Sequence, residues 1–330
     1  MIGDGHRWRS GFTRGRSALA ILLMSLGVVL VYLSPPLPNT LLVGADYLQL
    51  HSRRMQFARD ALLSPGFSLP AWYPGELLGT PFWSNLQNFP FIPTRLLVLL
   101  TMDPLGPYAH GVAVTFSALL AALFTYLYLR KVGLGLTACA SAGWTFACSG
   151  FYAARVAAGH LPLLEAYPAL PLLFWLVEAQ IHARQRGLPA RRWIVATSLA
   201  TACLMLAGHP QLTVYGLVAS AVYALWRGGS KLVAPIWGAM IVGVGCAAFA
   251  LVPMGLLVGR STRLLALAPA ANDITMPYGR LAALFLPWRD GMPPLVDDTP
   301  GNGFHGYPNL AYFWDTVCYV GLAARGESRE

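Results

Sequence analysis

The residues best suited to chemistry in this sequence are one carboxylate and two histidines beside apolar segments. Asp46 stands in the stretch GADYLQ, His160 follows Gly159, and His209 follows Gly208. A carboxylate can act as a general base when it reaches the proton that it removes. Neutral imidazole donates and accepts hydrogen bonds, which suits a sugar hydroxyl or a phosphate oxygen. Two histidines at matching positions are about equally consistent with a shared cavity and with two separate helix ends.

Further polar residues near the same segments are candidates for binding a substrate. Arg155 could bind a phosphate through two hydrogen bonds, or it could pair with Glu165, an acidic residue inside an apolar segment. For Arg260 and Arg263, contact with lipid headgroups is the simpler interpretation. The full candidate set for substrate binding is Gln49, Arg53, Arg155, His160, Glu165, His209, Gln211, Arg260 and Arg263.

The sequence contains no motif typical of a bound metal or nucleotide. There is no P-loop, no GxSxG and no HExxH, and the five cysteines form no CxxC pair. Neither a disulfide nor a zinc site is predicted. A divalent ion held by Asp46 together with one of the later aspartates stays possible in principle, although no spacing indicates it. These later aspartates are Asp273, Asp290, Asp297 and Asp298.

The segment that carries Asp46 is predicted to be an amphipathic helix over residues 44–66, ending at Pro65-Gly66. Its polar positions recur every three or four residues and therefore fall on one side of a helix. Such a helix can lie in the membrane interface. The polar side is either solvated or forms a wall of a site, and Asp46 either caps the helix or faces a cavity. The polar positions are Asp46, Gln49, Arg53, Gln56 and Asp60.

The composition indicates an all-α polytopic membrane protein. Of the 330 residues, 56% are hydrophobic and only 11% are charged, and the mean hydropathy is +0.53. A bilayer requires about 20 consecutive apolar residues. About eight transmembrane helices are expected, while the apolar piece 91–102 is too short to cross. The expected spans are 17–34, 107–129, 133–150, 161–181, 193–208, 211–226, 232–258 and 309–324.

The basic residues predict which side of the membrane each loop occupies. Short loops rich in Lys and Arg alternate with uncharged ones, so the positive-inside rule places the N-terminal residues 1–16 in the cytoplasm. The outer loops are then 35–106 and 259–308, in a single transmembrane domain of residues 1–330. The net charge of +9 comes from basic residues that cluster at the ends of the spans, and no nucleic-acid partner is expected. An uncleaved first span is favoured over a signal peptide.

The run PAWYPGELLGTPFWSNLQNFPFIP, residues 70–93, is rich in aromatic side chains. Trp72, Tyr73, Phe82 and Trp83 suit an aromatic belt at the membrane interface. They would also suit a surface on which a sugar stacks. The interfacial belt is the simpler interpretation.

These stretches together resemble the YfhO-like bacterial membrane proteins of the GT-C-type glycosyltransferase superfamily. The resemblance covers roughly residues 17–322 and is carried by GADYLQ, the 70–93 run, CSGFYAARVAAGHLPLLEAYPALPLLF, LAGHPQLTVY and YPNLAYFWDTVCYVGL. Family members are usually longer, so the chain looks truncated at its C-terminus.

The resemblance implies a GT-C-like fold and a reaction. A sugar would pass from a polyprenyl-phosphate carrier to a cell-envelope glycan, lipid or protein on the outer face of the bacterial inner membrane. Asp46 matches the family's carboxylate, which acts as acid/base or positions the acceptor, and His160 and His209 match its histidine positions, with Gln211 beside the second. The alternatives are a carrier or flippase for a lipid-linked glycan, and an inactive truncated paralogue.

Overall fold

The computed structural model describes residues 10–33 and 44–261, and almost all of its elements are helices. The helices are α1 (Ser10–Leu33), η1 (Tyr47–His51), α2 (Ser52–Leu63), η2 (Leu86–Asn88), α3 (Pro93–Thr101), α4 (Pro107–Val132), α5 (Leu136–Ala147), α6 (Gly150–Ala158), α7 (Leu161–Ala166), α8 (Ala169–Gln185), α9 (Arg191–Leu206), α10 (Pro210–Cys246) and α11 (Ala248–Gly259). Two short strands, β1 (Trp72–Tyr73) and β2 (Thr80–Pro81), pair antiparallel.

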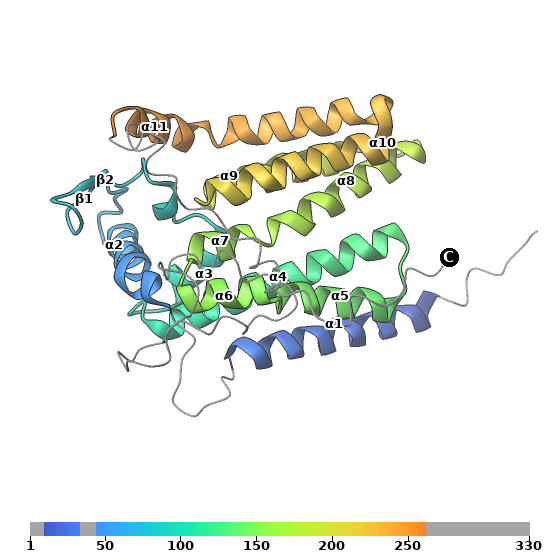
Figure 1. Ribbon diagram of the computed structural model, residues 1–330, viewed down its shortest axis with the longest axis horizontal. Coiled ribbons are helices and arrows are strands. Elements are labelled where there is room, and N and C mark those ends of the chain that lie inside the picture. The colour runs from blue at the N-terminus through green and yellow to red at the C-terminus, as the bar shows by residue number, and fades with distance from the viewer. Residues whose placement is uncertain (1–9, 34–43, 262–330) are drawn as a thin grey trace, which may run out of the picture.

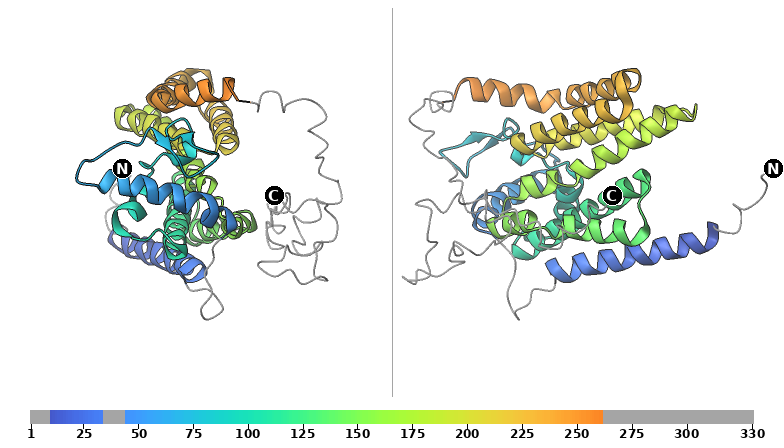
Figure 2. Two further views of the ribbon diagram at one scale, coloured as in Figure 1. Left: turned by 90° about the vertical axis from the view of Figure 1, so that its left-hand side faces the viewer. Right: turned by 45° about the vertical axis from the view of Figure 1, so that its right-hand side comes forward.

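The long helices lie side by side and form a bundle with two different ends (Figure 1). At one end, here called the loop end, lie η1, α2, α3, the two strands and η2. Figure 2 shows α2 and the strands in front of the bundle when this end faces the viewer. The other end, here called the basic end, contains the start of α1, the end of α4 and the junction of α8 with α9. The loops expected to be basic therefore share one end, as the positive-inside prediction requires.

Among the described residues, which are mostly helical, four stretches are long and apolar enough to cross a bilayer, as a helical membrane protein requires. They are Gly15–Leu33, Pro107–Val132, Leu161–Gln185 and Pro210–Cys246. The predicted spans 133–150 and 193–208 correspond to α5, with 12 residues, and α9, with 16 residues, which are shorter than this length. The predicted span 309–324 lies outside the described residues.

Helix α10 is a hairpin of two helical arms. Gly229 has φ 61° and ψ −175°, which is outside the helical region and reverses the chain direction. The indole Nε1 of Trp237 donates to the carbonyl of Ala221 at 3.1 Å, so residues eight positions on either side of Gly229 lie against each other. The two arms correspond to the separately predicted spans 211–226 and 232–258, of which the second continues into α11.

The predicted helix 44–66 is present, with an unexpected first turn. Residues Tyr47–His51 form a π-helical turn, in which the amide of Ser52 donates to the carbonyl of Tyr47. Helix α2 then continues to Leu63, just before Pro65. A π turn closes i→i+5 hydrogen bonds and is often found at functional sites.

Two of the four aromatic residues expected in an interfacial belt belong instead to the core. Tyr73 and Phe82 are buried and pack against Phe57 and Ala58 of α2. Trp72 is exposed. The expectation of a belt was therefore wrong for Tyr73 and Phe82, because the β1–β2 hairpin folds these rings back onto α2.

A buried ion pair joins α3 to α7. The guanidinium of Arg95 contacts the carboxylate of Glu165, and their side chains are only 1% and 0% exposed. Thr94 Oγ1 also donates to Glu165 Oε1, at 3.2 Å. The second Arg95 Nη donates to the carbonyls of Gln87 and Phe89 at 2.7 and 2.6 Å. Glu165 therefore pairs with Arg95 and not with Arg155, which corrects that expectation.

Breaking this pair should destabilise the fold strongly. Glu165→Gln leaves the Arg95 charge buried without a counter-ion, and we expect a loss of about 3–5 kcal/mol in the free energy of unfolding. The measurement is a denaturation curve of the purified protein in detergent.

The matched control is Asp103→Asn, which removes the exposed ion pair to Arg59 at 2.8 Å. It should cost less than about 1 kcal/mol. Equal losses in the two variants would show that the Arg95–Glu165 pair is not a major support of the fold.

Candidate functional site

Asp46, His160 and Arg155 form a connected chain of polar contacts at the loop end. Asp46 Oδ2 lies 3.2 Å from His160 Nε2, and Arg155 Nη1 lies 3.0 Å from His160 Nδ1. A guanidinium can only donate, so Nδ1 must be the acceptor. The remaining ring proton of a neutral imidazole is then on Nε2 and points at the Asp46 carboxylate. This contact, between residues 114 positions apart, unites two of the residues singled out in the sequence.

The carboxylate is accessible and ionised. The side chain of Asp46 is 46% exposed and that of His160 is 29% exposed, so a substrate can reach both. The hydrogen bond from His160 lowers the pKa of Asp46, against the opposing effect of partial burial. Asp46 is therefore ready to accept a proton at neutral pH, with its position fixed by His160.

Two glycines allow this contact by letting two backbones approach each other. A Cβ at Gly44 would lie 2.1 Å from the backbone of Ala158 and Gly159, and one at Gly159 would lie 2.6 Å from the amide nitrogen of Tyr47. Gly159 also has φ +83°, in the left-handed region that favours glycine. Because Asp46 is two residues from Gly44 and His160 directly follows Gly159, the glycine contact brings the two side chains close together.

A second glycine-histidine turn occurs between α9 and α10. Gly208 has φ +82°, and a Cβ there would lie 2.6 Å from the amide nitrogen of Gln87. His209 Nδ1 accepts from the amide of Leu212 at 3.1 Å and so caps α10. Gln211 is exposed, and its Nε2 lies 3.4 Å from the hydroxyl of Tyr215. His209 thus has the structural role that a helix-end histidine commonly has.

The other predicted binding residues are not gathered around Asp46. Gln49 and Arg53 are exposed, and among the described residues neither makes an ion pair or a side-chain hydrogen bond. Arg260 is exposed at the end of α11, and Arg263 lies outside the described residues. The side of the first outer helix that faces the protein carries His51 and Arg54 instead, so the middle of the predicted polar stripe, Gln49 and Arg53, is a solvated surface.

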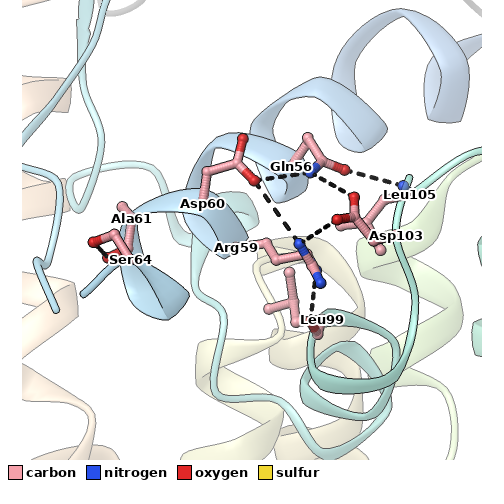
Figure 3. A network of polar contacts seen from close by, with 8 residues as sticks. All are labelled: Gln56, Arg59, Asp60, Ala61, Ser64, Leu99, Asp103 and Leu105. Atoms are coloured by element: carbon pink, nitrogen blue, oxygen red, sulfur yellow. Dashed lines mark hydrogen bonds and ion pairs between the residues drawn. The ribbon is translucent and has the colours of Figure 1, made fainter. Parts of the chain in front are cut away.

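The far half of that stripe attaches α2 to the end of α3 and to the segment between α3 and α4 (Figure 3). Gln56 contacts both Asp60 and Asp103 through its amide nitrogen, and its oxygen accepts from the amide of Leu105 at 3.0 Å. Arg59 donates to Asp103 and to the carbonyl of Leu99. These polar residues are used for anchoring and are not part of the wall around Asp46.

Sequence reasoning assigned no role to two charged residues of the loop end, Arg54 and Arg95. Arg54 binds Glu76 through Nε and Nη2, at 2.6–2.9 Å, and its Nη1 lies 3.4 Å from Gln87 Oε1. Arg95 binds Glu165. The available signal was that Arg54 and Arg95 are charged residues at otherwise apolar helix positions. Sequence spacing could not show their partners, which are 22 and 70 residues away.

An apolar cavity of about 540 Å³ lies between α4, α8 and α9. Thr94 and Glu165 line it at the loop end, and Trp193, near the start of α9, lines it toward the basic end. Its other lining residues are almost all apolar, including Phe116, Leu172 and Leu199. Its volume is in the range of small-molecule and cofactor sites. The wall residue Glu165 connects it, through Arg95, to the polar groups of the loop end.

Within residues 10–33 and 44–261, no group of three or more His, Cys, Asp or Glu side chains is arranged to hold a metal ion. Asp273, Asp290, Asp297 and Asp298, which were considered as partners of Asp46, lie outside the described residues. Comparison of the chain with models of known protein families, with curated proteins and with solved structures gave no match.

The glycine contact predicts a position-specific cost for a single methyl group. Gly159→Ala should destabilise the protein by several kcal/mol, since it adds a backbone clash to the strain of a left-handed alanine. Gly187→Ala is the control, because Gly187 has φ +65° with nothing within 4 Å of its Cβ position. It should cost only about 1–2 kcal/mol. Thermal melting of both variants in detergent tests this, and equal melting temperatures would contradict the close approach.

Proposed function

We propose that the protein is a membrane glycosyltransferase that transfers a sugar from a polyprenyl-phosphate carrier to an acceptor hydroxyl. The observation that carries this proposal is the ionised Asp46 carboxylate, oriented by His160 and accessible at the loop end of an apolar bundle. The same end adjoins a cavity suited to an apolar chain. Transfer from a lipid-linked donor requires a general base and a site for the apolar chain, and both are found in this part of the bundle.

The proposed topology has eight transmembrane helices with the loop end outside the bacterial inner membrane and the N-terminus in the cytoplasm. Seven of the expected spans fall at least partly within the described residues: α1, α4, α5 with α6, α7 with α8, α9, and the two arms of α10 with α11. A helix that is too short to cross the bilayer by itself reaches the required length when the next helix continues it, since each residue adds about 1.5 Å. The basic residues at the opposite end support this orientation.

In the proposed reaction, Asp46 accepts the proton of the acceptor hydroxyl as its oxygen attacks the anomeric carbon of the sugar. The bond between that carbon and the carrier phosphate breaks, and the phosphate leaves with the electron pair. His160 keeps its Nε2 proton toward Asp46 because Arg155 occupies Nδ1. His160 is thus a positioning residue that fixes the carboxylate and favours its ionised form.

The cavity is the proposed site of the carrier's isoprenoid chain. Its lining is apolar over most of its length, which excludes a polar substrate from that region. Binding the chain there would place the phosphate near the loop end, where Thr94 and Glu165 close the cavity. The acceptor, a glycan, lipid or protein of the cell envelope, would approach from the exposed side of Asp46.

One observation favours a carrier or flippase as the second candidate. Glu178 is fully buried in α8 and accepts hydrogen bonds from Tyr223 and Arg227, each at 2.6 Å. Buried polar groups within membrane spans often mark a path for polar cargo. Translocation of a lipid-linked sugar in liposomes, without transfer to any acceptor, would support this second function.

The base assignment predicts a large and selective loss of activity. Asp46→Asn should lower the transfer rate by about 10²–10⁴-fold, because the amide cannot accept the proton. Asp60→Asn is the control, since Asp60 is an exposed aspartate of the same helical segment. The measurement is sugar transfer from a polyprenyl-phosphate donor by protein in nanodiscs. Full activity of Asp46→Asn would remove Asp46 from catalysis.

The role of His160 predicts a shift in the pH profile. Activity needs ionised Asp46, so it is lost as pH falls through the pKa of that carboxyl, which is held below its usual range. His160→Phe removes the largest cause of the lowering, so the acidic limb of kcat/KM should move to higher pH. His160→Gln keeps a hydrogen-bond donor for Asp46 and should therefore move the acidic limb less. An unchanged limb in His160→Phe would contradict this role.

A further inference from the structure

The apolar cavity between α4, α8 and α9 is open along one side. Its floor is α8, against which α4 and α9 both pack, and Figure 1 shows α8 between these two helices. Leu199 and Cys203, one turn apart on α9, line the cavity and are also exposed, Leu199 to 58%. Side chains that border both the cavity and the outside form the rim of an opening. Because α9 belongs to a proposed membrane span, this opening faces lipid.

The opposite rim belongs to α4. Phe116, Leu120 and Phe124 line the cavity at spacings of four residues, so they lie on one side of that helix. All three are partly exposed. Apolar side chains therefore flank the opening on both helices. A hydrocarbon chain can pass between them without exchanging apolar contacts for polar ones.

The two ends of the cavity differ in chemistry. At the basic end Trp175 stacks on Phe124, with ring centroids 6.4 Å apart, and contacts the edge of Trp193 at 5.8 Å, so three aromatic rings close it. At the loop end Thr94 Oγ1 donates to Glu165, which is held in the buried ion pair described above. Glu165 is the only charged residue in the lining. The cavity thus offers no unpaired charge to a headgroup and suits only the apolar part of a lipid.

The length of the cavity limits how much of a chain it can hold. Its lining on α9 runs from Trp193 to Cys203, which is about 15 Å at about 1.5 Å per residue. A fully extended chain advances about 3.5 Å over the three backbone bonds of a residue, so the four bonds of an isoprene unit advance about 4.5 Å. The cavity is therefore long enough for about three isoprene units.

We propose that the cavity holds only about the first three isoprene units of the carrier, and that the rest of the chain leaves sideways between α4 and α9 into the bilayer. This rests on the proposed function and defines its donor class as polyisoprenyl phosphates of any length beyond those units. Past the rim, contact with protein is replaced by contact with lipid tails, which are equally apolar. Further units therefore neither strengthen nor weaken binding.

The first test compares geranyl, geranylgeranyl and undecaprenyl phosphate as probes that bind to the full chain in nanodiscs. Their chains are shorter than the cavity, slightly longer and much longer. Affinities are expressed as the mole fraction of probe in the bilayer, so that differences in membrane partitioning cancel. Binding should tighten from geranyl to geranylgeranyl phosphate, because more of the lining is contacted. The affinities for geranylgeranyl and undecaprenyl phosphate should then agree within about twofold.

A matched pair of variants tests the sideways exit. Leu199→Trp places a bulky ring on the rim and should weaken the binding of undecaprenyl phosphate about 10-fold or more. Geranyl phosphate ends inside the cavity and should bind as before. Val195→Trp is the control and should change neither affinity, because Val195 is also 58% exposed on α9 but lies outside the lining. Melting temperatures near wild type show that both variants are folded.

Sugar transfer, measured in the same samples, separates this inference from the proposed function. Transfer by wild type together with an affinity that keeps changing with chain length, or with equal effects of the two variants, overturns the sideways exit and leaves the transferase standing. A plateau in affinity that Leu199→Trp disturbs, without any transfer, supports the exit and overturns the transferase. Competition by a phospholipid as strong as that by geranylgeranyl phosphate overturns the carrier as occupant. Absence of both binding and transfer in wild type overturns both.

Discussion

The arrangement of the loop end depends on the burial of the Arg95–Glu165 ion pair. Two charges lose their hydration there, and that loss is tolerable only when each group keeps several hydrogen bonds. Glu165 receives them from α3, and Arg95 also binds the carbonyls of Gln87 and Phe89. The pair therefore fixes where the first outer loop sits on the bundle. Arg54 extends this arrangement, since it contacts Gln87 as well as Glu76.

Local sequence patterns predicted the elements well. Apolar length located the long helices α1, α4, α8 and the two arms of α10, and Pro65 marked the end of α2. Glycine followed by histidine correctly indicated chain breaks at the loop end. The exceptions were not visible in the local pattern. The hairpin of 70–93 is set by packing of aromatic rings on α2, which no local period reveals.

The site was only partly predictable, because charge pairing is not local. Asp46 and His160 were both selected from the sequence, but their contact depends on two glycines 115 positions apart, Gly44 and Gly159. Arg53 was preferred over Arg54 from helical spacing, whereas Arg54 faces the protein. Arg155 was assigned to a phosphate or to Glu165. The structure pairs Glu165 with Arg95 and places Arg155 against His160. The candidate residues thus came from residue type, and their roles came from the tertiary fold.

The contact between Gly44 and Gly159 has a consequence for the time scale of the site. It contains backbone atoms only, so the rotation of a side chain cannot open it. Rotamer changes take picoseconds to nanoseconds, whereas collective displacement of a packed segment takes microseconds to milliseconds. Removing the Asp46 side chain from its position beside His160 by a backbone movement would belong to the slower class. The backbone that carries Asp46 is thus held beside the backbone that carries His160 on the time scale of side-chain rotation, and it leaves that position only when the packed segment moves.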